Sequence, residues 1–132
     1  GSEMCIRDRI QTEHAPAAFG PYSQAVVVDG WVFCSGQIPI DPETGDLIQG
    51  DIKAQTEQVL MNLSSVLEKA GSSLRGVVKT TVFLSDIDDF GAMNEVYARH
   101  FHDHRPARAA VQVGALPKLC SVEIECIARL ER

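Results

Sequence analysis

An arginine and a glutamate interrupt two apolar segments near the C-terminal end of the chain. Arg108 opens a strand-like run just after Pro106, and Glu123 lies in the segment 121–129, which otherwise has the composition of a buried strand. A guanidinium grips a carboxylate through two parallel hydrogen bonds, which fixes orientation as well as charge. A partly buried carboxylate tends towards a raised pKa, which suits proton transfer near neutral pH. The two residues therefore indicate a site for a small zwitterion or amino-acid derivative.

Each of the two residues also has a purely structural interpretation. Arg108 could form an ion pair with a carboxylate of the sheet, and Glu123 could be a solvated strand residue like Glu125. Because side chains alternate along a strand, Glu123 and Glu125 are expected on the same face. The spacing alone leaves both interpretations open.

Two helices and five or six strands are predicted to hold these residues in place. Asp51 is a good N-cap, a 3.6-residue apolar stripe follows it, and Gly71 is suited to end that helix. A second helix is expected to begin at 86–89 and to end near His104. Strands are expected at 23–28, 31–35, 77–84, 109–113 and 121–129. The order β-β-α-β-α-β-β predicts a two-layer α+β domain with both helices on one face of the sheet.

The other face of the sheet is also expected to carry apolar side chains. Val27, Val32, Phe83 and Val111 are the candidates for this face, although the sequence does not decide which residue lies on which side. A sheet face that is too apolar for water implies an oligomer.

Length, charge and cysteine pattern narrow the class of protein. The 132 residues fit one domain, expected at 10–132, after a polar segment 1–9 that resembles a tag or a disordered leader. The formal net charge of −6 disfavours a protein that binds nucleic-acid phosphates. No apolar run is long enough for a signal peptide or a membrane span. The four cysteines lack CxxC spacing, so a reduced, cytoplasmic setting without a structural zinc site is expected.

Three histidines at the predicted end of the second helix suggest a metal site at first sight. His100 and His104 would share one face of the helix, with His102 between them. However, the segment lacks a zinc motif such as HExxH, and positive charge is favourable at a helix C-terminus. A solvated helix end is the preferred interpretation, and no metal site is predicted.

An ordered set of short motifs extends over about residues 10–130. The motifs are Ala15-Pro16, Gly20-Pro21-Tyr22-Ser23-Gln24, Ser35-Gly36-Gln37-Ile38-Pro39, Val78-Lys79-Thr80-Thr81-Val82-Phe83-Leu84, Asn94 with Tyr97, Pro106-Ala107-Arg108, Leu116-Pro117 and Glu123-Ile124-Glu125. In this order they resemble the RidA (YjgF) family of enamine/imine deaminases. No single tripeptide is specific, but the ordered set is.

The resemblance implies both a fold and an activity. The fold would be chorismate-mutase-like α+β, with a mixed sheet of five to six strands and two helices on one face. Three subunits would form a homotrimer with a central barrel and ligand clefts between subunits. The activity would be hydrolysis of reactive 2-imino or 2-enamino acids, such as 2-iminobutanoate and 2-iminopropanoate, to 2-keto acids and ammonia. Neither a metal nor an organic cofactor would take part, and no nucleic-acid or membrane partner is implied.

The same resemblance assigns roles to the charged pair and to four further residues. Arg108 would bind the substrate carboxylate, and Glu123 would position or deprotonate the attacking water.

Tyr22 and Ser35 would line the cleft, and the Ser35 hydroxyl would donate to the substrate or its water. Tyr22 could instead be an interface aromatic, and Ser35 could simply end a strand. Gly36 would let backbone approach a ligand or another subunit, and Asn94 would contact the ligand or bond backbone across the trimer.

The chain departs from the family pattern at two positions near the arginine. Many members carry a cysteine two residues after it, whereas this chain has Ala110, so a thiol there cannot be essential. Arg105 stands where an aromatic residue is common, which could reshape the cleft mouth and its substrate preference.

Three other functions remain open at this point. The trimer could bind a small carboxylate metabolite without catalysis, act as an endoribonuclease or translation inhibitor, or have a chaperone-like role. The acidic net charge weighs against the ribonuclease.

Overall fold

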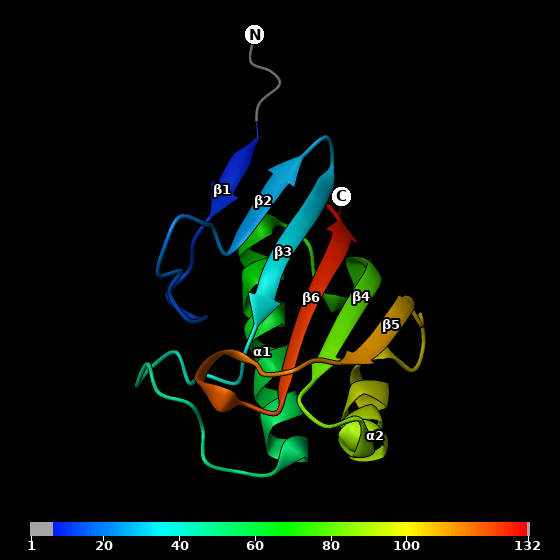
Figure 1. Ribbon diagram of the computed structural model, residues 1–132. Helices are drawn as coiled ribbons and strands as arrows, with labels where there is room; N and C mark the ends of the chain where they lie inside the picture. The colour runs from blue at the N-terminus through cyan, green and yellow to red at the C-terminus, as the bar shows by residue number, and fades with distance from the viewer. Residues whose placement is uncertain (1–6, 132) are drawn as a thin grey trace, which may run out of the picture.

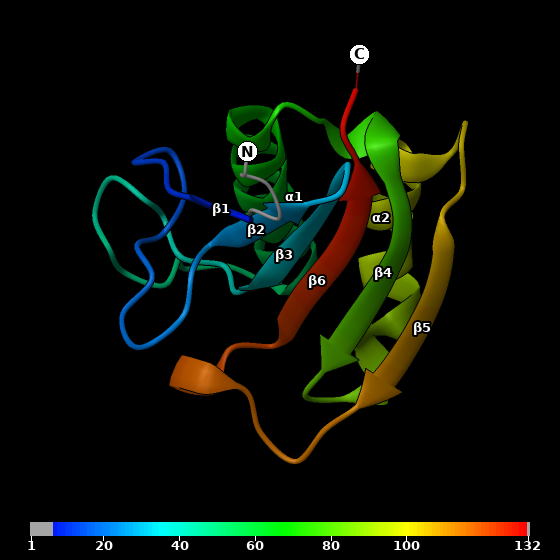
Figure 2. The ribbon, with the colours of Figure 1, turned by 90° about the horizontal axis from the view of Figure 1, so that it is seen from above.

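A six-stranded mixed sheet with two helices packed on one face forms the structure, a computed structural model that describes residues 7–131 (Figures 1 and 2). The strands run in the spatial order β1-β2-β3-β6-β4-β5, and only β4 and β5 are parallel. The elements are β1 (Asp8–Ile10), β2 (Ala25–Val28), β3 (Trp31–Gln37), α1 (Ile52–Ala70), β4 (Val77–Leu84), α2 (Phe90–Phe101), β5 (Ala107–Gln112) and β6 (Val122–Arg129). Single 3-10 turns lie at Leu74–Gly76, Ile87–Asp89 and Pro117–Leu119. The predicted α+β fold is confirmed.

Helix α1 is capped as its sequence predicts. The Asp51 carboxylate accepts a hydrogen bond from the backbone N–H of Ala54. Gly71 ends the helix in the left-handed conformation, with φ of 95°, which glycine adopts without a Cβ clash. The apolar stripe of the helix is buried against the sheet.

The core lies between the helices and the alternate residues of the central strands. On β4, Thr80, Val82 and Leu84 point to the helices and are fully buried, whereas the residues between them point to the opposite face. β6 alternates in the same way. Both helices of the described part lie on the other side of the sheet and leave this opposite face, called here the open face, uncovered by helix (Figure 2). In β3, Phe33 points to the open face and is 44% exposed.

Two expected boundaries need correction. Residues 8 and 9 belong to strand β1, which pairs with β2, so the ordered sheet begins earlier than 10; residues 1–6 lie outside the described part. The second helix ends at Phe101 rather than near His104.

Two of the four residues expected on the apolar open face are also misplaced. Val32 is fully buried under the helices, and Val27, its partner in the β2–β3 register, packs against the same core. Phe83 and Val111 do point to the open face. An alternating pattern predicts two faces but does not say which one meets the helices.

No helix in residues 7–131 is long and apolar enough to cross a membrane.

A core substitution in α1 tests how strongly this two-layer packing holds the fold. Leu63 is fully buried between helix and sheet, so Leu63→Ala is expected to lower the free energy of unfolding by about 2–5 kcal/mol. Met61 lies on the same helix and is 52% exposed, so Met61→Ala should change it by less than about 0.5 kcal/mol. Denaturant titration of both variants measures the difference, and equal effects would contradict the packing described.

Candidate active site

Arg108 lies on the edge strand β5 and points to the helix face of the sheet. In the parallel register with β4 it stands beside Thr80, which faces the helices. Its Nη1 donates a hydrogen bond of 2.6 Å to Oδ1 of Asn94 on α2. The guanidinium carbon lies 4.7 Å from the ring centroid of Tyr97 and 5.2 Å from that of Phe90. The guanidinium is therefore oriented by one amide and two aromatic rings.

The aromatic support of Arg108 is itself anchored in the core. The Tyr97 hydroxyl shares a hydrogen bond of 2.7 Å with the Thr80 hydroxyl, and both residues are buried. Burial raises the pKa of Tyr97, against the opposing effects of the Thr80 bond and of the nearby Arg108 charge. A neutral phenol therefore lies beneath the cation.

Most of the hydrogen-bonding capacity of Arg108 is left for a ligand. A guanidinium has five N–H donors, and Asn94 accepts from one of its nitrogens. Among the described residues, no carboxylate forms an ion pair with Arg108. The structural interpretation of Arg108 as half of a sheet ion pair therefore does not hold within this part of the chain.

Glu123 lies on β6 and points to the open face, where it is half-buried. Burial raises the pKa of its carboxyl group, and the neighbouring Glu125 carboxylate raises it further. The antiparallel register of β3 and β6 is interrupted between Cys34 and Gln37, next to this carboxylate.

Gly36 makes room for the Glu123 carboxylate. A Cβ atom built on Gly36 would collide with the Glu123 carboxylate oxygen Oε2. The absence of a side chain at position 36 therefore serves an intramolecular contact, whereas the sequence had suggested approach by a ligand or another subunit.

The Ser35 hydroxyl is already engaged within the chain. It donates a 2.6 Å hydrogen bond to the carbonyl oxygen of Ser23, and the Ser35 backbone N–H donates to the carbonyl of Gln24. The expected donation from Ser35 to a substrate or water stays a prediction, since it would require the hydroxyl to leave this bond. Its hydroxyl holds the segment before β2 against the end of β3.

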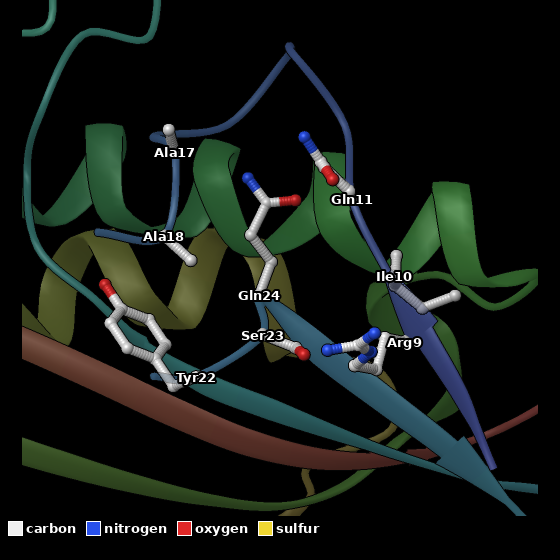
Figure 3. Close-up of a pocket in the computed structure, with 8 residues that line it drawn as sticks. All are labelled: Arg9, Ile10, Gln11, Ala17, Ala18, Tyr22, Ser23 and Gln24. Carbon is white, nitrogen blue, oxygen red and sulfur yellow. The ribbon is translucent and has the colours of Figure 1, made fainter. Parts of the chain in front are cut away.

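Tyr22 lies in that segment and is 54% exposed. With Arg9, Ser23 and Gln24 it lines a cavity of about 400 Å³ between β1, β2 and the preceding loop (Figure 3). Gln24 fixes this loop, because its side-chain amide donates to the carbonyls of Thr12, Ala15 and Pro16. Gln24 thus holds the loop that carries Tyr22, a role that its place in the motif Gly20-Pro21-Tyr22-Ser23-Gln24 does not reveal.

The six candidate residues form two separate clusters in one chain. The Arg108 cluster holds Asn94 and Arg108, and the Glu123 cluster holds Tyr22, Ser35, Gly36 and Glu123. Arg108 stands beside Thr80 and Glu123 beside Phe83, so the two charged residues point to opposite faces of the sheet. Two strand spacings separate them by about 10 Å, and three residues along the strands add about 10 Å. A single chain does not bring the pair together.

The histidines at the end of α2 and just beyond it contact different partners and do not converge. His100 Nε2 lies 3.0 Å from a carboxylate oxygen of Glu57 on α1, and His104 Nε2 lies 2.8 Å from the carbonyl of Leu74. The expectation of a solvated helix end is therefore corrected for these two residues. Residues 7–131 contain no cluster of three or more side chains suited to hold a metal ion.

The two-layer fold and the two clusters define a class of small α+β proteins with a cation on the edge strand. Family comparison identifies the class: the model of the family described as Endoribonuclease L-PSP matches residues 12–130. The chain belongs to this family, which contains the RidA (YjgF) proteins that its motifs resemble.

Relatives of known name share about half of their residues with this chain. A RutC family protein of Pyrococcus abyssi is 53% identical over 125 residues, which are 95% of this chain and 98% of the relative. A 2-iminobutanoate/2-iminopropanoate deaminase of Rattus norvegicus is 52% identical over 123 residues, which are 93% of this chain and 90% of the relative. The crystal structure of RidA from the Antarctic bacterium Psychrobacter sp. PAMC 21119 superposes with a TM-score of 0.89 at 52% identity, covering 93% and 99% of the two chains.

The environment of Glu123 predicts a pH-dependent gain of stability in Glu123→Gln. Its pKa in the folded protein lies above that of the unfolded chain, so the unfolded chain ionises first as the pH rises. The wild type thus loses stability from the ordinary glutamate pKa upwards, until the raised pKa is passed. The glutamine variant, which cannot ionise, should match the wild type at about pH 3 and have a higher Tm at about pH 8.

Thermal unfolding followed across this pH range tests the prediction. Glu43 is exposed in the segment between β3 and α1, so Glu43→Gln, which removes one exposed carboxylate, is the control. A Tm difference for Glu123→Gln that grows as the pH falls would have the wrong sign.

Proposed function

We propose that this protein hydrolyses reactive 2-imino and 2-enamino acids, such as 2-iminobutanoate and 2-iminopropanoate, to 2-keto acids and ammonia. The observation that carries the proposal is the Arg108 guanidinium, which is oriented by Asn94, Phe90 and Tyr97 and retains donors for a ligand carboxylate. The names of the rat and human relatives, 52% and 50% identical to this chain, support the same reaction class.

Arg108 would anchor the substrate and orient its reacting carbon. A carboxylate can accept two parallel N–H bonds from the guanidinium, which fixes the plane of a 2-imino acid. The aromatic rings beneath the guanidinium limit its freedom, so less conformational entropy is lost when a ligand binds.

Glu123 would handle the water and the protons of the reaction. Water adds its oxygen to the C=N carbon while a proton reaches the nitrogen, and the resulting carbinolamine loses ammonia to leave the keto group. A carboxylate with a raised pKa is suited to take a proton from water and to return one to nitrogen near neutral pH. Free imines already hydrolyse in water, so positioning and modest acid–base help are sufficient.

A complete cleft would need two subunits, because Arg108 and Glu123 lie in separate clusters. β5 and the Tyr22 loop lie at opposite ends of the sheet, which suits head-to-tail association into a closed ring (Figure 1). The exposed aromatic and apolar groups of the open face, such as Phe33 and Val111, support a trimer in which the sheets enclose a central barrel.

Replacing the anchor is expected to impair deamination. Arg108→Gln should lower kcat/KM for 2-iminobutanoate by about 10–100-fold, because a charged hydrogen bond contributes roughly 1.5–3 kcal/mol. The imine is generated in situ by a threonine dehydratase, and keto acid formation is followed above the spontaneous rate. Arg99 is exposed on α2, and Arg99→Gln is the matched control. Equal rates for wild type and Arg108→Gln would contradict the mechanism, and RNA cleavage with steep salt dependence would favour the ribonuclease instead.

A mixing experiment tests whether the cleft is shared. Arg108→Gln and Glu123→Gln subunits are co-assembled in equal amounts. If each cleft takes Arg108 from one subunit and Glu123 from its neighbour, about one third of the clefts in each mixed trimer, or about one quarter of all clefts after random assembly, regain both residues. Activity well above that of either parent variant is therefore expected. Activity no higher than that of the parents would mean that both residues act from the same chain.

A further inference from the structure

A second arginine lines the cavity that contains Arg108. This cavity of about 500 Å³ is bounded by the end of α2 and the start of β5, and its polar lining includes Asn94, His102, Arg105 and Arg108. Among residues 7–131, no acidic side chain lines it. Its volume is within the range of small-molecule sites. The polar groups of the cavity thus offer two fixed positive charges and no negative charge.

Arg105 is held at the cavity by the way in which the helix ends. Its backbone N–H donates to the carbonyl of Phe101, and its Nε donates to the carbonyl of His102 at 3.2 Å. Its backbone φ of 35° is in the left-handed region, which asparagine and glycine adopt at lower cost than arginine. The turn geometry therefore does not explain an arginine at this position.

The neighbouring charges do not neutralise this side chain. Asp103 is the nearest acidic residue in sequence, but its carboxylate lies 3.0 Å from His102 Nε2 and does not line the cavity. In the part of the chain described, Arg105 forms no ion pair. Arg105 and Arg108 are three positions apart in the chain, a span of at most about 10 Å. Their two long side chains can therefore reach both ends of one small ligand.

We propose that Arg105 determines substrate specificity by binding a second carboxylate, so that the site favours dicarboxylic 2-imino acids of four or five carbons. This inference rests on the proposed function, with Arg108 binding the carboxylate next to the imine carbon and Arg105 the distal one. The reaction is unchanged: water adds to the C=N carbon, ammonia leaves, and 2-iminosuccinate yields oxaloacetate. The distal carboxylate takes no part in the chemistry.

The test compares a dicarboxylic with a monocarboxylic imine in one set of variants. Wild type, Arg105→Asn, Arg105→Lys and Arg99→Asn are assayed with 2-iminosuccinate and 2-iminobutanoate, each generated in situ by an amino-acid oxidase or dehydratase. The ratio of kcat/KM for the diacid to that for the monoacid should fall about five- to tenfold in Arg105→Asn. Arg105→Lys should retain part of the ratio, and Arg99→Asn all of it. Asparagine suits the left-handed turn, so the Tm of Arg105→Asn should not fall.

A binding measurement separates this inference from the proposed function. Calorimetric titration with 2-oxoglutarate and 2-oxobutanoate, which are stable keto acids, should show tighter binding of the diacid, and this preference should be lost in Arg105→Asn. If no imine is hydrolysed but this preference is found, the proposed function fails and the specificity site stands. A different result would overturn the specificity site and leave the proposed function standing. In that case monocarboxylic imines are hydrolysed, but Arg105→Asn changes neither the kcat/KM ratio of diacid to monoacid nor the binding preference for 2-oxoglutarate.

Discussion

The two-residue period of the strands is the constraint on which the site depends. It directs Arg108 to the helix face through its register with Thr80, and Glu123 to the open face through its register with Phe83. A shift by one residue in either strand would reverse the direction of its charged residue, and in β6 it would also expose core side chains such as Ile124. The energy of the core therefore fixes the direction of each charged residue. A cleft that used both residues would therefore have to take them from different subunits.

The helix face and the open face treat their charges in different ways. Arg108 lies over the rings of Phe90 and Tyr97, and the buried bond between Tyr97 and Thr80 ties this support to the core. A cation can lie on aromatic rings without losing all its hydration. Glu123 has no such support within the described chain, and burial beside Glu125 raises its pKa. Aromatic rings thus support the cation, whereas burial and the neighbouring Glu125 raise the pKa of the Glu123 carboxyl group, and both features suit the proposed roles.

The sequence predicted the layers better than it predicted the faces. The Asp51 cap, the Gly71 terminus and the strands that became β4 and β6 follow from local patterns, and the structure contains them. The placement of Val32 and the use of the Ser35 hydroxyl depend on tertiary pairing, which local patterns do not encode. The three residues that contact the Arg108 guanidinium could have been grouped from the sequence. Phe90, Asn94 and Tyr97 recur at helical spacing and so share one face of α2, but spacing does not reveal that this face meets β5.

The open face carries charge as well as apolar surface, and this bears on how it could be buried. Lys79 alternates with Thr80 on β4, and Arg129 alternates with Ala128 on β6, so both bases share the open face with Glu123 and Glu125. The formal charges on these four residues sum to zero, and the Arg129 guanidinium already lies 5.4 Å from the ring centroid of Trp31. Burial of such a face against another copy leaves no net charge to neutralise, although each carboxylate still needs a partner or water. A half-buried glutamate whose pKa is raised costs stability, and its proposed role in proton transfer would account for the retention of that cost.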